Sequence, residues 1–175
     1  MAIEQNIGKR ITREEAYALT DENQKSGFVM QCANDQRPNF FCACCSDCCG
    51  LLKMFKAVPN PAEYVASNFS AAVNNDVCVG CTLCVKKCPM DAIVITNKMA
   101  VILYDRCIGC GVCTIACSVN AIELIKRSVE SIPPMTVEDL FVELNKSKIN
   151  LRKKLILVYR FIKRQAKLKI TKLIQ

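Results

Sequence analysis

Eight of the 14 cysteines in this 175-residue chain form two runs with the same spacing. Each run reads Cys-x-x-Cys-x-x-Cys-x-x-x-Cys, and every cysteine of the second run follows its counterpart at the same offset. The first run is Cys78, Cys81, Cys84 and Cys88, and the second is Cys107, Cys110, Cys113 and Cys117. Because the chain has no histidine, any metal chemistry at these positions is thiolate chemistry. The repeat predicts two equivalent sites.

Metal ligation suits these thiols better than disulfide bonding. The first residues, MAIEQNIGKRITREE, lack the apolar core of a secretory signal, so we expect a reducing cytoplasm where disulfides are rare. Two [4Fe–4S] clusters would use all eight thiolates, whereas two zinc sites, the alternative, leave the third cysteine of each run unexplained. Apolar neighbours are expected to exclude water, and glycines to let amides approach sulfur. These neighbours are Val79, Val85, Ile108, Val112 and Ile115, with Gly80, Gly109 and Gly111.

A second group of cysteines precedes the repeat. Five of them lie close together: Cys42, Cys44, Cys45, Cys48 and Cys49. Cys32 lies ten positions before the first of the five. This density favours a third iron–sulfur cluster held by four of the five, with Cys32 as a reserve ligand. Zinc, a switchable thiol pair and buried free thiols are the alternatives.

Local patterns predict the elements that position these cysteines. A capping box that begins at Thr12 predicts a helix that ends near Gly27. The sequence IVITNKMAVIL predicts a β-hairpin with its turn at Asn97. A strand at 69–73 is expected to pair with one at 121–125, and the fourth cysteine of each run is expected to lie on a short helix.

The repeat resembles the bacterial ferredoxins that carry two [4Fe–4S] clusters, over about residues 69–127. The resemblance implies an α+β, ferredoxin-like fold of two pseudo-symmetric halves. It also implies crossed ligation, in which the fourth cysteine of each run serves the other cluster. One cluster would be held by Cys78, Cys81, Cys84 and Cys117, and the other by Cys88, Cys107, Cys110 and Cys113. The chain departs from the family pattern once, since Ser118 rather than proline follows Cys117.

The longer stretch 12–127 is similar to a group of ferredoxin-like proteins from anaerobic bacteria, through TREEAYAL, a CxCCxxCCG run, VASNF and both cysteine motifs. This similarity implies electron transfer. No residue of the repeat resembles a catalytic acid, base or nucleophile, so we expect an electron carrier and not an enzyme. We expect this carrier to be the small subunit or the partner of an anaerobic oxidoreductase complex. The alternatives are an enzyme using the N-terminal cluster for thiol or disulfide chemistry, and a redox-sensing regulator. The chain is divided into 1–68, 69–127 and 128–175.

Charge is segregated along the chain. All 16 acidic residues lie at or before Glu143 with 13 basic residues, which gives that part a net charge of −3. The rest of the chain, 144–175, holds 11 basic residues and no acid. Apolar residues at steps of three and four predict an amphipathic helix over 149–175. Its basic face is formed by Arg160, Lys163, Arg164 and Lys167.

The tail is expected to be a docking helix. We expect it to bind a redox partner subunit or the body of the chain itself, or to lie on an anionic membrane surface. Nucleic acid is the least favoured partner. The longest apolar run of the tail, LILVY at 155–159, is too short to span a membrane, so we expect a cytoplasmic protein, peripheral at the inner membrane face if it binds lipid.

Overall fold

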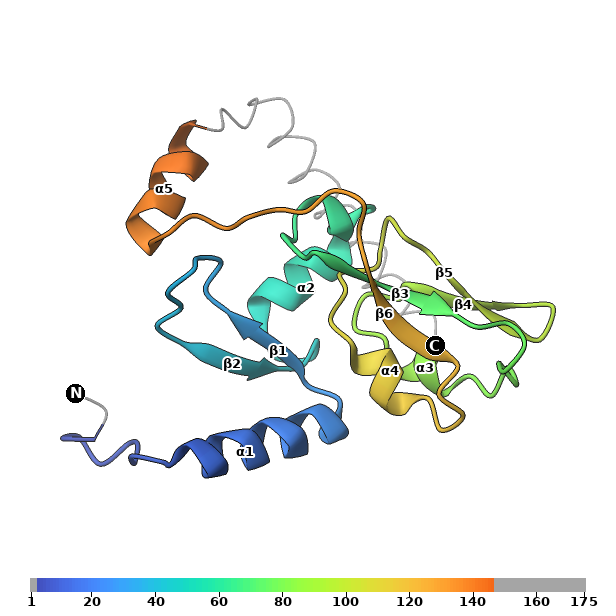
Figure 1. Ribbon diagram of the computed structural model, residues 1–175, viewed down its shortest axis with the longest axis horizontal. Helices are drawn as coiled ribbons and strands as arrows, with labels where there is room; N and C mark the ends of the chain where they lie inside the picture. The colour runs from blue at the N-terminus through green and yellow to red at the C-terminus, as the bar shows by residue number, and fades with distance from the viewer. Residues whose placement is uncertain (1–2, 147–175) are drawn as a thin grey trace, which may run out of the picture.

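Figure 1 shows the computed structural model, which describes residues 3–146. The described part mixes short helices with three two-stranded antiparallel sheets. The elements are α1 (Arg13–Ser26), β1 (Val29–Cys32), β2 (Phe41–Cys44), α2 (Gly50–Ala57), the 3₁₀ helix η1 (Pro61–Glu63), β3 (Phe69–Val73), α3 (Leu83–Lys87), β4 (Ile93–Thr96), β5 (Met99–Ile102), α4 (Val112–Ala116), β6 (Ile122–Lys126) and α5 (Val137–Lys146). The expected tail helix at 149–175 lies outside the described residues.

Helix α1 begins and ends where the sequence predicts. The Thr12 hydroxyl accepts a hydrogen bond from the Glu15 amide at 3.1 Å, and the Thr12 amide donates to the Glu15 carboxylate at 2.7 Å. This reciprocal pair is the capping box. At the other end Gly27 has φ 90°, and the Phe28 amide donates to the Asn23 carbonyl, which closes a Schellman motif.

The two sheets of the repeat confirm the expected strand pairings. Strands β4 and β5 form a hairpin that turns through Asn97 and Lys98, which both have positive φ, as the twist of a two-residue turn requires. Strand β3 pairs with β6, which begins one residue later than expected. The reason lies at Ala121, whose amide donates to the Cys117 sulfur at 3.2 Å instead of joining the ladder.

One hydrophobic core joins the N-terminal segment to the repeat. Val29 of β1 and Leu52 of α2 belong to the same cluster of buried side chains as Met90, Ile93 and Ile108. In Figure 1 helix α2 lies between the β1–β2 hairpin and the strands of the repeat. The division of the chain at residue 68 stays a prediction, and the core shows that the first two parts pack together.

Arg106 makes the polar contacts between the N-terminal segment and the repeat. Its Nε donates to the Met90 carbonyl at 2.8 Å, and its Nη2 donates to the Lys56 carbonyl at 3.2 Å. Its Nη1 donates to the carbonyls of Val58 and Pro59, each at 3.1 Å. The guanidinium therefore binds the end of α2 to the segment that follows the first cysteine run. The sequence patterns did not single out Arg106, although an arginine directly before Cys107 breaks the repeat, whose first half has valine at that place.

The segment after β6 returns to the N-terminal half. The Asn68 side chain donates to the Ser131 carbonyl at 2.9 Å and accepts from the Ser131 amide at 2.7 Å. The Gln36 amide donates to the Pro134 carbonyl at 2.9 Å, which attaches the same segment to the loop of the β1–β2 hairpin. Among residues 3–146, no helix has the length and apolar character needed to cross a bilayer.

Candidate functional site

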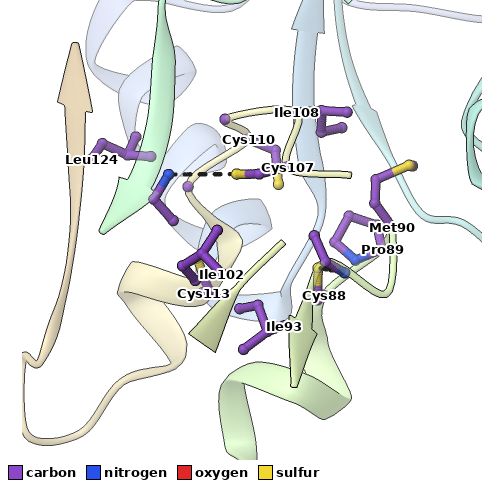
Figure 2. A pocket seen from close by; sticks show the side chains of 14 residues that line it. Cys88, Pro89, Met90, Ile93, Ile102, Cys107, Ile108, Cys110, Cys113 and Leu124 are labelled. Carbon is purple, nitrogen blue, oxygen red and sulfur yellow. Dashed lines mark hydrogen bonds between the residues drawn. The ribbon is translucent and has the colours of Figure 1, made fainter. Parts of the chain in front are cut away.

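The eight cysteines of the repeat line two separate cavities, and each cavity receives cysteines from both runs. One cavity is lined by Cys88 together with Cys107, Cys110 and Cys113. Figure 2 shows Cys88 reaching this cavity from a different segment than Cys107 and Cys110. We call the cavity that contains Cys88 the second cavity, because its other three cysteines belong to the second run. The first cavity is lined by Cys78, Cys81, Cys84 and Cys117.

Backbone amides point at four of these sulfurs in a repeated pattern. The amides of Ala71 and Ala100 donate to Cys107 and Cys78 respectively, each at 3.4 Å. The two donors occupy equivalent positions of the repeat, and so do the two acceptors. The Ala92 amide donates to Cys88 at 3.2 Å, matching the bond from Ala121 to Cys117. Amide donors stabilise negative charge on sulfur, so both cavities suit thiolates that carry charge.

Two glycines allow the cysteine loops to pass close to neighbouring strands. Gly80 has φ 66° and Gly109 has φ 68°, and these conformations are costly for other residues. A Cβ at Gly80 would overlap the Lys98 carbonyl, and a Cβ at Gly109 would overlap the Phe69 carbonyl. These two contacts are also equivalent in the repeat. The expectation that glycines let amides approach sulfur stays a prediction, because the groups that approach Gly80 and Gly109 are backbone carbonyls and the amides that donate to sulfur belong to alanines.

The fourth cysteine of each run does not lie on a helix, contrary to expectation. Cys88 and Cys117 come directly after α3 and α4 and have extended backbones, with φ/ψ of −70°/116° and −85°/100°. Proline after Cys88 explains the extended conformation in the first half, because proline disfavours helix at the preceding residue. Cys117 adopts the same turn before Ser118. The alanine amides that bind the two sulfurs provide a constraint common to both halves.

The apolar neighbours of the cysteines differ in burial. Ile108 and Val112 are buried as expected, and Val85 is half-buried, but Val79 and Ile115 are exposed, so these two do not exclude water.

Burial also changes the acidity of the thiols in the second cavity. It raises the pKa of Cys113 to about 12 and the pKa of Cys110 to about 11, with nearby thiols adding to both effects. Metal binding would have to displace these protons, which couples loading of the second cavity to pH.

The N-terminal cysteines cluster around the start of α2. The Cys45 and Cys48 sulfurs are 3.0 Å apart, and the hydrogen bond between them lowers the pKa of Cys45. Burial, reinforced by a hydrogen bond with Cys49, raises the pKa of Cys44 to about 11. Within residues 3–146, no three His, Cys, Asp or Glu side chains converge as they would around a single metal ion.

Cys32 is separated from this group by the register of its hairpin. Gln31 pairs with Cys42, so Cys42 and Cys44 lie on the face of the hairpin that carries Gln31. Side chains alternate along a strand, and Cys32 therefore lies on the opposite face. The hairpin gives no support to Cys32 as a reserve ligand for the other five.

Comparison with known proteins finds that residues 77–122 match the family model of a 4Fe-4S dicluster domain. The B subunit of the ion-translocating oxidoreductase complex is 54% identical over 28 residues in both Haemophilus ducreyi and Pasteurella multocida, which is 16% of this chain. Protein Pixie of Drosophila melanogaster is 36% identical over 53 residues, 30% of this chain. The aligned stretches span 14% of the two bacterial proteins and 8% of Pixie.

Proposed function

We propose that this chain, whose residues 77–122 match a 4Fe-4S dicluster domain, is an electron-transfer protein that holds one [4Fe–4S] cluster in each cavity of the repeat. The observation that carries the proposal is the sorting of eight cysteines into two mixed quartets, each with the same amide donors to sulfur. A thiolate-ligated [4Fe–4S] cluster supplies one-electron redox chemistry. Ligation is crossed in this proposal, and the fold is the pseudo-symmetric ferredoxin fold.

The lining of both cavities supports a carrier that is not itself an enzyme. Among residues 3–146, the second cavity is lined by cysteines, glycines and apolar residues alone, and the first adds only Thr82 to those classes. A surface of this kind holds a cluster and limits its hydration, but it offers a substrate no general acid or base. The chain's part is therefore to bind the clusters, set their potentials and pass electrons on.

We further propose that the protein works within a multi-subunit oxidoreductase complex. Support comes from the 28 residues that are similar to the B subunit of an ion-translocating oxidoreductase complex. The similarity supports electron transfer within such a complex. The electron donor and the electron acceptor have to be identified by experiment.

The N-terminal cysteines form the third part of the proposal. Cys44, Cys45, Cys48 and Cys49 interact with one another at the start of α2, and Cys42 acts electrostatically on Cys44. We propose that four of the five hold a third iron–sulfur cluster. The short distance between the Cys45 and Cys48 sulfurs favours one alternative, a thiol pair that switches between reduced and oxidised forms.

Anaerobic iron and sulfide analysis tests these proposals together. Three cubane clusters give about 12 of each per chain, and two give about 8. Dithionite reduction followed by EPR should show reduced [4Fe–4S] signals. About 8 iron atoms without zinc would reject the third cluster and favour the thiol pair, whereas zinc with little iron would reject the electron-transfer proposal itself.

A further inference from the structure

Equivalent positions of the repeat differ sharply in exposure around the two cavities. Val79 is 64% exposed, but its counterpart in the second half, Ile108, is 7% exposed. Leu83 is 43% exposed, and its counterpart Val112 is 3% exposed. A third pair shows the same difference between the cavities: Val119, beside the first, is 36% exposed, and Met90, beside the second, is 1% exposed. The side chain at each position is apolar in both halves, so side-chain polarity does not account for the difference.

We attribute the difference to the N-terminal segment. Its Leu52 packs in the same core as Met90 and Ile108, which line the second cavity, and the Arg106 hydrogen bonds hold the end of α2 beside them. An ion pair of 2.9 Å between Lys56 and Asp91 adds to the same contact. Within the described residues the first cavity has no such cover, and its ligand candidate Cys81 is exposed.

We propose that the exposed apolar surface formed by Val79, Leu83 and Val119 is the docking site at which an external redox protein exchanges electrons with the cluster of the first cavity. The inference deepens the proposed function and rests on it. Electron transfer weakens steeply with distance, so a partner docked here would react with the first cluster. The second cluster would exchange electrons with the first cluster and with the N-terminal cysteine site on its covered side.

The charges beside this surface indicate the chemistry of the partner. Lys86 lies one helical turn after Leu83 on α3, so the two side chains are neighbours on the helix surface. The Lys98 backbone lies against Gly80 in the first cysteine loop, and its side chain is exposed. Two basic residues beside an apolar patch suit a partner with an acidic rim around an apolar centre. We therefore assign the site to an acidic electron carrier.

The test uses the full chain with its clusters, reduced by dithionite, and an acidic flavodoxin as the acceptor probe. Stopped-flow absorbance gives the second-order rate of flavodoxin reduction. Val79→Glu should lower this rate at low salt by about tenfold, because it places a charge in the apolar patch that repels the acidic rim. Val101→Glu is the matched control, since Val101 is an exposed valine on the opposite face of the β4–β5 hairpin from Ala100, which lines the first cavity. The control should keep the wild-type rate within about twofold, in line with a charge outside the interface.

Iron and sulfide analysis counts the clusters in each variant, and the rate is compared per chain that holds both clusters of the repeat, which separates docking from cluster assembly. Equal rates in wild type, Val79→Glu and Val101→Glu would overturn the docking site, as would a wild type that reduces ferricyanide but not flavodoxin. If both variants lose clusters, Lys98→Gln provides the second test, and an unchanged rate there would overturn the acidic-partner assignment. A wild type that dithionite cannot reduce, or that reduces neither acceptor, would contradict the proposed electron-transfer function instead.

Discussion

Cys88 and Cys117 each follow a short helix and line a cavity together with three cysteines of the other run. Each sulfur is held at 3.2 Å by the amide of an alanine that follows it in the chain. Backbone hydrogen bonds also hold the two turns, since the amides of Cys88 and Cys117 donate to the carbonyls of Val85 and Thr114 at 3.3 Å each. We therefore expect removal of the thiol to delete a ligand while these bonds keep the turn. The ligand sets can therefore be separated by substitution.

Crossed ligation predicts which pairs of cysteine variants damage the same cluster. Of the eight iron atoms expected in the repeat, Cys117→Ala should remove about four. Adding Cys78→Ala should remove no more, because both residues serve the first cavity, while adding Cys107→Ala should remove about four further atoms. Iron analysis and EPR of the reduced protein measure the outcome. Ser118→Ala is the control and should leave both clusters intact; the reverse pattern in the double variants would refute crossed ligation.

Gly109 and Gly80 should resist substitution for a steric reason. Alanine at either position would combine a positive φ, which costs about 1–2 kcal/mol, with overlap of a backbone carbonyl. We expect Gly109→Ala and Gly80→Ala to lower the melting temperature and to speed anaerobic cluster loss to a chelator. Gly50→Ala is the matched control, because a methyl group there would meet no atom within 4 Å and Gly50 begins α2. A cluster lifetime equal to that of the control would contradict the argument.

At the scale of elements, local patterns determine what the sequence can predict. The Thr12 capping box, the Asn97 turn and the pairing of 69–73 with the strand after the second cysteine run all depend on residues close in sequence or repeated in it. These predictions are confirmed, with a shift of one residue at Ala121 because its amide binds sulfur. The cysteine quartets are implied by the family resemblance, and the two cavities group the eight cysteines in the same way, while ligation itself stays a proposal.

The sequence could not show how the two halves come to differ. Val79 and Ile108 occupy equivalent places in equivalent motifs, so no local rule gives one high exposure and the other low exposure. We attribute the difference to α2, which packs beside the second cavity through Leu52 and is held there by long-range hydrogen bonds from Arg106 to carbonyls at and just after its end. Every residue has a backbone carbonyl, so the sequence does not show which carbonyls Arg106 binds, and these contacts could not be predicted from it.

Arg106→Ala should loosen the N-terminal segment from the repeat. The change removes hydrogen bonds to four carbonyls, and a half-buried guanidinium with these partners should contribute about 2–3 kcal/mol. Amide hydrogen exchange in α2 should increase and chemical denaturation should shift to lower denaturant concentration. Lys53→Ala, on the exposed side of α2, is the control and should change neither measurement by much. Unchanged exchange in the Arg106 variant would show that apolar packing at Leu52 is sufficient.

On the scale of the whole molecule, the chain combines an acidic body with a basic tail. Residues 1–143 have a net charge of −3, and two bound dianionic clusters would bring it to about −7. The 11 basic residues of 144–175 oppose this charge. Such segregation attracts the basic tail toward an acidic surface. The tail and the first cavity would then have different roles. The tail would attach the protein to its site of action, and the exposed first cavity would exchange electrons with a redox partner.

Removing residues 149–175 should abolish association with a partner or membrane and leave the clusters intact, because no cysteine lies beyond Cys117. An anionic membrane and an apolar protein interface should respond differently when the basic residues of the tail are neutralised. Replacing Arg160, Lys163, Arg164 and Lys167 with Gln should weaken binding to anionic lipid by about 1 kcal/mol for each charge near the surface. A mainly apolar protein interface should be affected much less, because the expected stripe of apolar residues is left unchanged by these substitutions.

Co-sedimentation with phosphatidylserine-containing vesicles at low and high salt decides between these surfaces. Binding by the full chain at low salt, reduced by salt and by the four Gln substitutions, supports the membrane. The control is the truncated chain, which should stay in the supernatant under both conditions with its EPR signals unchanged. Absence of lipid binding at low salt, with a co-purifying subunit retained by the Gln variant, would favour the protein interface. If truncation alters neither association, the tail packs on its own body, and the docking role assigned to it is wrong.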